Sequence, residues 1–197
     1  VQPPGTPTVG QTYLKAYRRT QEPYLLAAAL ETGVALLQGQ LHSGGWDYRI
    51  EFEPATRTRY AYRVDGKKLE KRNVTTLDDN TTQSAVQFLI QLDKTLGFNN
   101  PEIHSGAQFA LEQILRAQYP LGAWPQRYDR FPDPARFPVL TASYPSSWSR
   151  QFPKLDYRTY YTFNDNTIAD MITTMFLASS VYDEPRYFAA AERAGDF

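Results

Sequence analysis

The chain has no cysteine and only two histidines among its 197 residues. The absence of cysteine excludes a disulfide-stabilised scaffold and any metal site built on thiolates. His42 and His104 lie far apart in the sequence and do not form a zinc-binding spacing. We therefore expect both histidines to be structural or surface residues.

The chain also lacks an excess of charge of either sign and any long hydrophobic run. It carries 21 basic and 21 acidic side chains, so its net charge is zero with neutral histidines. No overall field favours nucleic acid or an anionic membrane, and no segment has the apolar length needed to span a bilayer. We expect no nucleic-acid partner, no membrane insertion and a monomer.

Aromatic side chains are abundant, at 14% of residues with 14 tyrosines. Tyrosine combines an apolar ring with a polar tip. Such side chains suit a carbohydrate groove, in which sugar rings stack on aromatic faces and hydroxyl groups meet polar edges. An aromatic core would use the same residues, so composition alone leaves both interpretations open.

The most informative pattern is the frame Gln-x-x-x-Gly-x-Trp, which occurs twice. It falls on Gln40, Gly44 and Trp46, and 78 residues later on a second set, Gln118, Gly122 and Trp124. Both copies follow an apolar run of helical period. A repeat of this length is typical of stacked helical units, each of which cannot bury its apolar face alone.

The repeat opens a third time near the end of the chain. Asp183–Ala191 is similar to Gln21–Ala29, and the chain reaches Phe197 before a third Gln-x-x-x-Gly-x-Trp frame. We therefore expect residues 1–197 to be a single α/α toroid catalytic domain that is truncated at its C-terminal end.

Helical periodicity predicts three helix pairs. The six helices are expected over 8–19, from Pro23, over 79–96, from Pro101, from 164–165 and from Pro185. Alternating apolar residues over 48–52 and 60–64 predict a β-hairpin, and 128–161 has no helical period. The expected fold class is all-α, an α/α toroid of three helix pairs with a small β-hairpin excursion and a long aromatic loop.

Two acidic sequence segments, which we call phrases, match each other at the predicted starts of two helices. Asp78, Asp79 and Asn80 stand together in 77–82, and Asp165 lies in the parallel segment 163–168. Such residues are common N-caps, each worth about 0.5–2 kcal/mol. Carboxylates brought together on one rim would instead suit Ca²⁺, which prefers oxygen ligands. The sequence leaves both explanations open.

The segment 128–161 interleaves aromatic rings with cationic side chains. A long irregular loop in a compact domain is commonly functional. Rings that stack and guanidinium groups that bind carboxylates suit an anionic sugar polymer. Single-stranded nucleic acid is the less favoured ligand because the net charge is zero, and a cover packed over the core is the structural alternative.

Three segments of the chain together resemble a known family. Gly44-Gly45-Trp46, the segment 117–128 (Ala-Gln-Tyr-Pro-Leu-Gly-Ala-Trp-Pro-Gln-Arg-Tyr) and the phrase Thr-Phe-Asn-Asp over 162–165 resemble pectate lyases of polysaccharide lyase family 10. The resemblance implies an α/α toroid that cleaves polygalacturonate by Ca²⁺-assisted β-elimination, in a secreted or periplasmic protein. In that family the base is an arginine, which by position would lie beyond Phe197.

The resemblance also implies roles for individual residues. Asp78 and Asp165 would be catalytic, and both would hold calcium together with Asp79. The residues expected to bind the anionic polysaccharide are Trp46, Trp124, Gln126, Arg127, Tyr128, Trp148, Tyr161 and Asn164.

The chain departs from the family pattern at the second acidic phrase. The family has His-x-Thr-Phe-Asn-Asp-Asp, whereas this chain has Tyr160 in place of the histidine and Asn166 in place of the last aspartate. The affinity for calcium and the identity of the polymer therefore stay open. Three rivals share this architecture or ligand: a triterpene cyclase, an inverting glycoside hydrolase with two carboxylates and no metal, and a non-catalytic uronate-polymer-binding domain.

Overall fold

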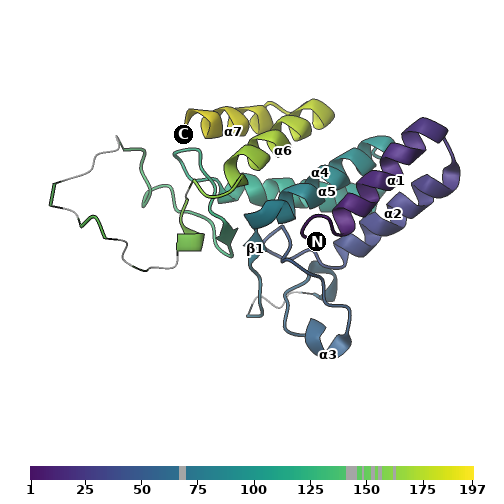
Figure 1. Ribbon diagram of the computed structural model, residues 1–197, viewed down its shortest axis with the longest axis horizontal. Coiled ribbons are helices and arrows are strands. Elements are labelled where there is room, and N and C mark those ends of the chain that lie inside the picture. The colour runs from purple at the N-terminus through teal and green to yellow at the C-terminus, as the bar shows by residue number, and fades with distance from the viewer. Residues whose placement is uncertain (67–69, 141–145, 148, 152–153, 155–156, 162) are drawn as a thin grey trace.

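The computed structural model of the protein is mostly helical (Figure 1). It describes every residue except 67–69, 141–145, 148, 152–153, 155–156 and 162. The α-helices are α1 (Thr6–Thr20), α2 (Pro23–Leu37), α3 (Pro54–Arg57), α4 (Thr81–Thr95), α5 (Pro101–Ala117), α6 (Thr167–Tyr182) and α7 (Pro185–Asp196). Short 3₁₀ helices are η1 (Arg63–Asp65), η2 (Asp78–Asn80) and η3 (Tyr157–Thr159), and the strands are β1 (Thr75–Thr76) and β2 (Arg127–Tyr128).

Six of the helices form the three predicted pairs. α1 packs on α2, α4 on α5 and α6 on α7, while α4 also contacts α1, α2 and α6. Because α4 has neighbours on several sides, its apolar side chains are fully buried, among them Val86, Phe88, Leu89 and Ile90. The hydrophobic core therefore lies around α4 and connects all three pairs.

The second helix of each pair begins with a proline, as the repeat predicts. Pro23, Pro101 and Pro185 occupy the first position of α2, α5 and α7. A proline is tolerated there because its missing N–H would have no helical partner. None of the helices in the described parts of the chain is long and apolar enough to cross a membrane.

The two Gln-x-x-x-Gly-x-Trp turns have the same internal hydrogen bonds. Gln40 Nε2 donates to the Gly44 carbonyl at 3.1 Å, and Gln118 Nε2 donates to the Gly122 carbonyl at 2.7 Å. Each glutamine also donates to a helix of the next pair, at the carbonyls of Gly106 on α5 (2.9 Å) and Ala190 on α7 (2.8 Å). The repeated frame therefore joins each helix pair to the next one.

The predicted hairpin over 48–52 and 60–64 is wrong. In its place are α3 and η1, gathered around the guanidinium of Arg57, which donates to the carbonyls of Glu51 (3.1 Å) and Gln38 (2.8 Å) and to Asp65 (3.1 Å). These bonds replace a β-ladder. A small two-stranded sheet does form in the described part of the chain, from β1 and β2, which are antiparallel with Thr75 opposite Tyr128.

Candidate functional site

The two tryptophans of the repeated turns are structural, which corrects the expectation that they bind substrate. Trp46 and Trp124 are both 0% exposed. Their indole N–H groups donate to the carbonyls of Leu36 (2.8 Å) and Ile114 (2.9 Å), each ten residues upstream. Each ring thus closes its own turn against the preceding helix and cannot contact a sugar.

The sheet brings the first acidic phrase next to the second repeated turn. The Leu77 N–H donates to the Gln126 carbonyl at 2.7 Å, directly beyond the paired strands. Asp78 consequently meets Arg127, with Nη2 and Oδ2 3.8 Å apart, and Gln126 Nε2, which donates to Oδ1 at 3.4 Å. Tyr48 completes this group: its hydroxyl donates to Asp78 Oδ2 at 2.9 Å and accepts from Arg127 Nη2 at 3.0 Å.

We call Tyr48, Asp78, Gln126 and Arg127 the Asp78 cluster. Burial raises the pKa of the Tyr48 hydroxyl, while its hydrogen bond from Arg127 acts in the opposite direction and Asp78 raises it further. Tyr48 was not expected to be a site residue, since its alternation with Ile50 and Phe52 indicated only a strand. Gln126 and Tyr128, both expected to bind substrate, are 2% and 4% exposed, so little of either side chain is accessible to a ligand.

The second feature is an acidic pocket between η2 and the start of α6. Its lining residues are Asp79, Asn80, Asp165, Asn166, Thr167 and Asp170. The two matching segments have the same backbone conformation at one position, since Asp79 and Asp165 both have positive φ, at 51° and 50°. They differ at the next residue, where φ is 55° in Asn80 and −100° in Asn166. The parallel recognised in the sequence is therefore a structural equivalence at the two aspartates and not over the whole segment.

Capping does not explain these residues. Asn80 and Asn166 occupy the N-cap positions of α4 and α6, and neither makes a side-chain capping hydrogen bond. Asp79, rather than Asp78, lines the pocket together with Asp165. The Asp78 carboxylate is held instead in the adjacent cluster by Tyr48.

Unpartnered oxygen atoms line or adjoin the acidic pocket. The side-chain oxygens of Asn80, Thr81 and Thr167 are buried and have no hydrogen-bond partner. Thr167 lines the pocket and is only 2% exposed. A buried oxygen without a partner costs about 1–3 kcal/mol, and a hard cation would satisfy it. The donor set contains only carboxylate, amide and hydroxyl oxygens, which are the ligand types that calcium prefers.

The three carboxylates of the pocket are not gathered around one point. No group of three acidic or histidine side chains is close enough to hold a metal ion in the described part of the chain. Asp79 accepts from Gln2 at 3.0 Å and Asp165 from Asn164 at 2.9 Å. Burial raises the pKa of Asp170, a residue that sequence reasoning missed although it stands in the first turn of α6.

A third feature, the cationic groove, lies beside the Asp78 cluster and shares Arg127 with it. This cavity of about 330 Å³ lies at the start of the predicted aromatic loop and is lined by Tyr119, Pro125, Arg127, Tyr128, Asp129, Arg130, Phe131, Pro132 and Phe137. Arg116 lies over the Phe131 ring, 3.9 Å from its centroid, which fixes that ring against α5. The groove thus combines aromatic walls with the guanidinium groups of Arg127 and Arg130.

The remaining predicted site residues lie near the other end of the loop. Tyr161 forms a β-bridge with Pro125, and its ring meets that of Tyr119 edge to face at 4.9 Å. Asn164 is half-buried and donates to Asp165. Trp148 falls outside the described residues. Tyr119 and Phe137 were not predicted as site residues, although Phe137 belongs to the aromatic loop that the sequence singled out.

Comparisons with known proteins bear on the family and the fold. Residues 40–189 match the family model described as pectic acid lyase. A family 10 polysaccharide lyase from Cellvibrio cellulosa has a similar structure, with a TM-score of 0.54, 20% sequence identity and coverage of 95% of this chain and 48% of that one.

A mutant of a family 10 polysaccharide lyase from the same organism, in complex with trigalacturonic acid, is similar to the same degree. It has a TM-score of 0.54, 20% identity and coverage of 95% and 49% of the two chains. This chain therefore spans about half the length of the enzymes whose fold it shares. No curated protein is significantly similar to it in sequence.

Proposed function

Since the chain belongs to the pectic acid lyase family, we propose that it binds polygalacturonate and takes part in its cleavage by calcium-assisted β-elimination. The observation that carries this proposal is the adjacency of an oxygen-lined acidic pocket and an arginine-lined aromatic groove, joined through neighbouring Asp78 and Asp79. The trigalacturonic acid bound by the mutant lyase supports the same class of ligand.

The chemistry explains why both features are needed. The C5 proton of a galacturonate unit can be removed only if the charge that builds on the adjacent carboxylate is stabilised. Calcium bound by Asp79, Asp165, Asp170 and the oxygens of Asn80 and Thr167 would supply that stabilisation.

The chain's other residues bind and orient the polymer. Arg127 presents a guanidinium to a uronate carboxylate, and Asp78 with Tyr48 holds that guanidinium in place. The aromatic walls of the groove pack against the apolar faces of the sugar rings.

We further propose that the three helix pairs are an arc of an α/α toroid and that residues 1–197 belong to one catalytic domain. The protein would act as a monomer, secreted or periplasmic, where its polymer is found. The half-length match to the Cellvibrio enzyme supports the toroid.

The calcium part is tested with two matched variants. We expect calcium to raise the melting temperature of the wild-type chain and its affinity for oligogalacturonate. Asp165→Asn keeps the side-chain shape but removes a charge that the ion needs. Each of the two responses should therefore require at least a tenfold higher calcium concentration in this variant. Asp196→Asn, at the exposed end of α7, is the control. A wild-type response in Asp165→Asn would refute the calcium site.

Product analysis tests the reaction class. Elimination leaves an unsaturated uronate that absorbs ultraviolet light, whereas an inverting hydrolase releases reducing ends without a double bond. Cleavage without unsaturated products would contradict the lyase proposal. Binding with no cleavage by the full-length protein would favour the non-catalytic alternative.

A further inference from the structure

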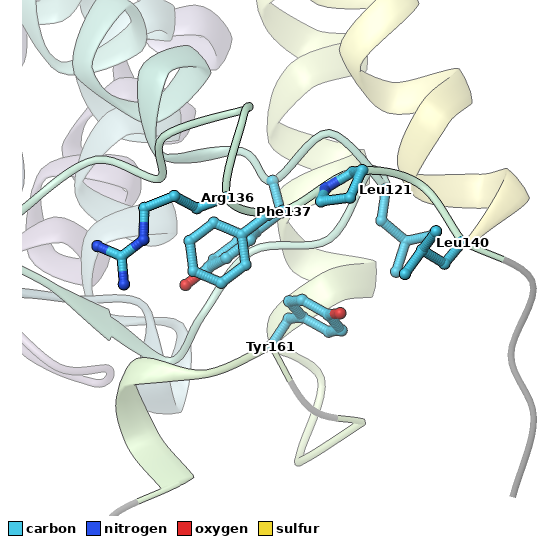
Figure 2. A pocket seen from close by; sticks show the side chains of 7 residues that line it. Leu121, Arg136, Phe137, Leu140 and Tyr161 are labelled. Atoms are coloured by element: carbon cyan, nitrogen blue, oxygen red, sulfur yellow. The ribbon is translucent and has the colours of Figure 1, made fainter.

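A further pocket adjoins the cationic groove at the rings of Tyr119 and Phe137. We name it the Tyr161 pocket; its volume is about 210 Å³, and it is lined by Tyr119, Leu121, Arg136, Phe137, Pro138, Leu140 and Tyr161. Figure 2 shows Phe137 between Arg136 on one side and Leu121 with Leu140 on the other, with Tyr161 facing it. The pocket therefore has a cationic end and an apolar end.

The aromatic wall of this pocket is fixed by packing. Tyr119 is 9% exposed, and Phe137 and Tyr161 both meet its ring edge to face at 4.9 Å. A turn holds Phe137, whose N–H donates to the Pro134 carbonyl at 3.3 Å. The bridge from Pro125 to Tyr161 ties the end of the loop to the second repeated turn. The three rings are thus positioned before any ligand binds.

Arg136 supplies the only charge among the described residues that line the pocket. Its side chain is exposed, and none of the described carboxylates is within ion-pair distance of it, in contrast to Arg127 and Arg130, which lie near Asp78 and Asp129. A guanidinium at the mouth of an aromatic pocket suits a ligand with one carboxylate and an apolar face. A uronate ring has both features.

The size of the pocket limits the ligand. Its volume of about 210 Å³ is smaller than the 330 Å³ of the cationic groove, so it suits a single unit of a polymer better than an extended segment. The pocket shares the walls Tyr119 and Phe137 with the cationic groove, so the two cavities adjoin. A polymer lying in the groove can therefore place a terminal or flanking unit in the Tyr161 pocket.

We propose that the Tyr161 pocket is an additional subsite for one galacturonate unit, with Arg136 bound to its carboxylate and Phe137 and Tyr161 packed on its ring. This inference rests on the proposed function, because it assumes that the groove binds the same polymer. It predicts that the chain binds long oligogalacturonates more tightly than short ones.

The test is calorimetric titration of the full chain with galacturonate trimer and hexamer, at low salt. The wild type should bind the hexamer at least tenfold more tightly than the trimer. Arg136→Gln should remove most of that difference and leave trimer affinity within twofold. Arg130→Gln, in the cationic groove, should weaken both ligands, and Arg19→Gln, exposed on α1, should change neither. The loss of hexamer affinity in Arg136→Gln should become smaller as the salt concentration is raised, because the guanidinium of Arg136 is exposed and its charge is screened.

The outcomes separate the two proposals. Hexamer binding that is unchanged in both Arg136→Gln and Tyr161→Ala would overturn the subsite while leaving the proposed function intact. Failure of the wild type to bind either oligomer would overturn both. Length-dependent binding through Arg136, together with no unsaturated product from the full-length protein, would support the subsite and contradict the lyase. Circular dichroism establishes that each variant is folded.

Discussion

At the scale of single residues, the repeated turns depend on their glycines for two independent reasons. Gly44 and Gly122 have φ values of +108° and +110°, which side chains rarely adopt. There is also no room for a side chain, since a Cβ at Gly122 would lie 2.0 Å from the Arg193 carbonyl oxygen. Because that neighbour is backbone, it cannot move aside cheaply.

We therefore predict that Gly122→Ala lowers the free energy of unfolding by about 2 kcal/mol or more, through backbone strain and displacement of α7. Gly195→Ala is the matched control, because Gly195 lies in α7 and a Cβ added there would have no heavy atom outside its own helix turn within 4 Å. It should be neutral or stabilising by up to about 1 kcal/mol. Urea denaturation measures both, and equal effects would show that α7 does not need close contact with the turn.

Asp170 gives a pH-dependent prediction. Burial raises its pKa in the folded protein, so the folded state binds the proton more tightly than the unfolded chain does. The contribution of Asp170 to the stability of the fold is then greatest below its pKa in the unfolded chain, about 3.9. This contribution is lost as the pH rises through the pKa of Asp170 in the folded protein. At neutral pH without calcium, Asp170→Asn should therefore be more stable than the wild type.

Calcium should reverse that order if Asp170 is a ligand. A ligand at a hundred times its Kd stabilises the folded state by about 2.7 kcal/mol, and the Asn variant should gain much less than the wild type. Thermal unfolding with chelator or with calcium measures both effects. Equal stabilisation of the two proteins by calcium would remove Asp170 from the site.

At the scale of elements, helical periodicity was a reliable guide and strand periodicity was not. The six long helices lie where apolar spacing and prolines placed them, because each buries one face against its pair. The segment around Tyr60 and Tyr62 has the alternation of a strand, and the two rings do stack at 5.2 Å. Local alternation cannot show that Arg57 would satisfy the neighbouring carbonyls in place of a second strand.

Part of the candidate site was predictable because it lies at the starts of helices that the periodicity located correctly. The equivalence of Asp79 with Asp165 follows from matched phrases at matched helix starts. The sequence could not show that Asp78 faces Tyr48 and Arg127, because that contact depends on the pairing of β1 with β2 across a long separation. The role of Trp46 and Trp124 was misjudged because a hydrogen bond to a carbonyl ten residues upstream leaves no local signal.

At the scale of the whole molecule, the helix pairs do not bury equivalent faces equally. When segment 77–82 is aligned with segment 163–168, Val86 and Ile90 of α4 correspond to Ile172 and Phe176 of α6. The two α4 side chains are 0% exposed, whereas Phe176 is 44% exposed. Phe176 lies against Phe188 of α7, 45% exposed, with ring centroids 5.6 Å apart. The outer face of the third pair is therefore an apolar surface of the kind that the second pair buries.

We predict that this face binds a hydrophobic dye in the 197-residue chain, and that Phe176→Ser with Phe188→Ser removes most of the signal. Because both rings are nearly half exposed, the double variant should lose less than about 2 kcal/mol of unfolding free energy, well below the cost of truncating two buried phenylalanines. Phe52→Ser is the matched control, since Phe52 is an exposed ring (60%) outside the helix pairs; it should leave dye binding unchanged. Undiminished dye binding in the double variant, or a stability loss typical of core positions, would show that the two rings are interior side chains and that this face is already covered.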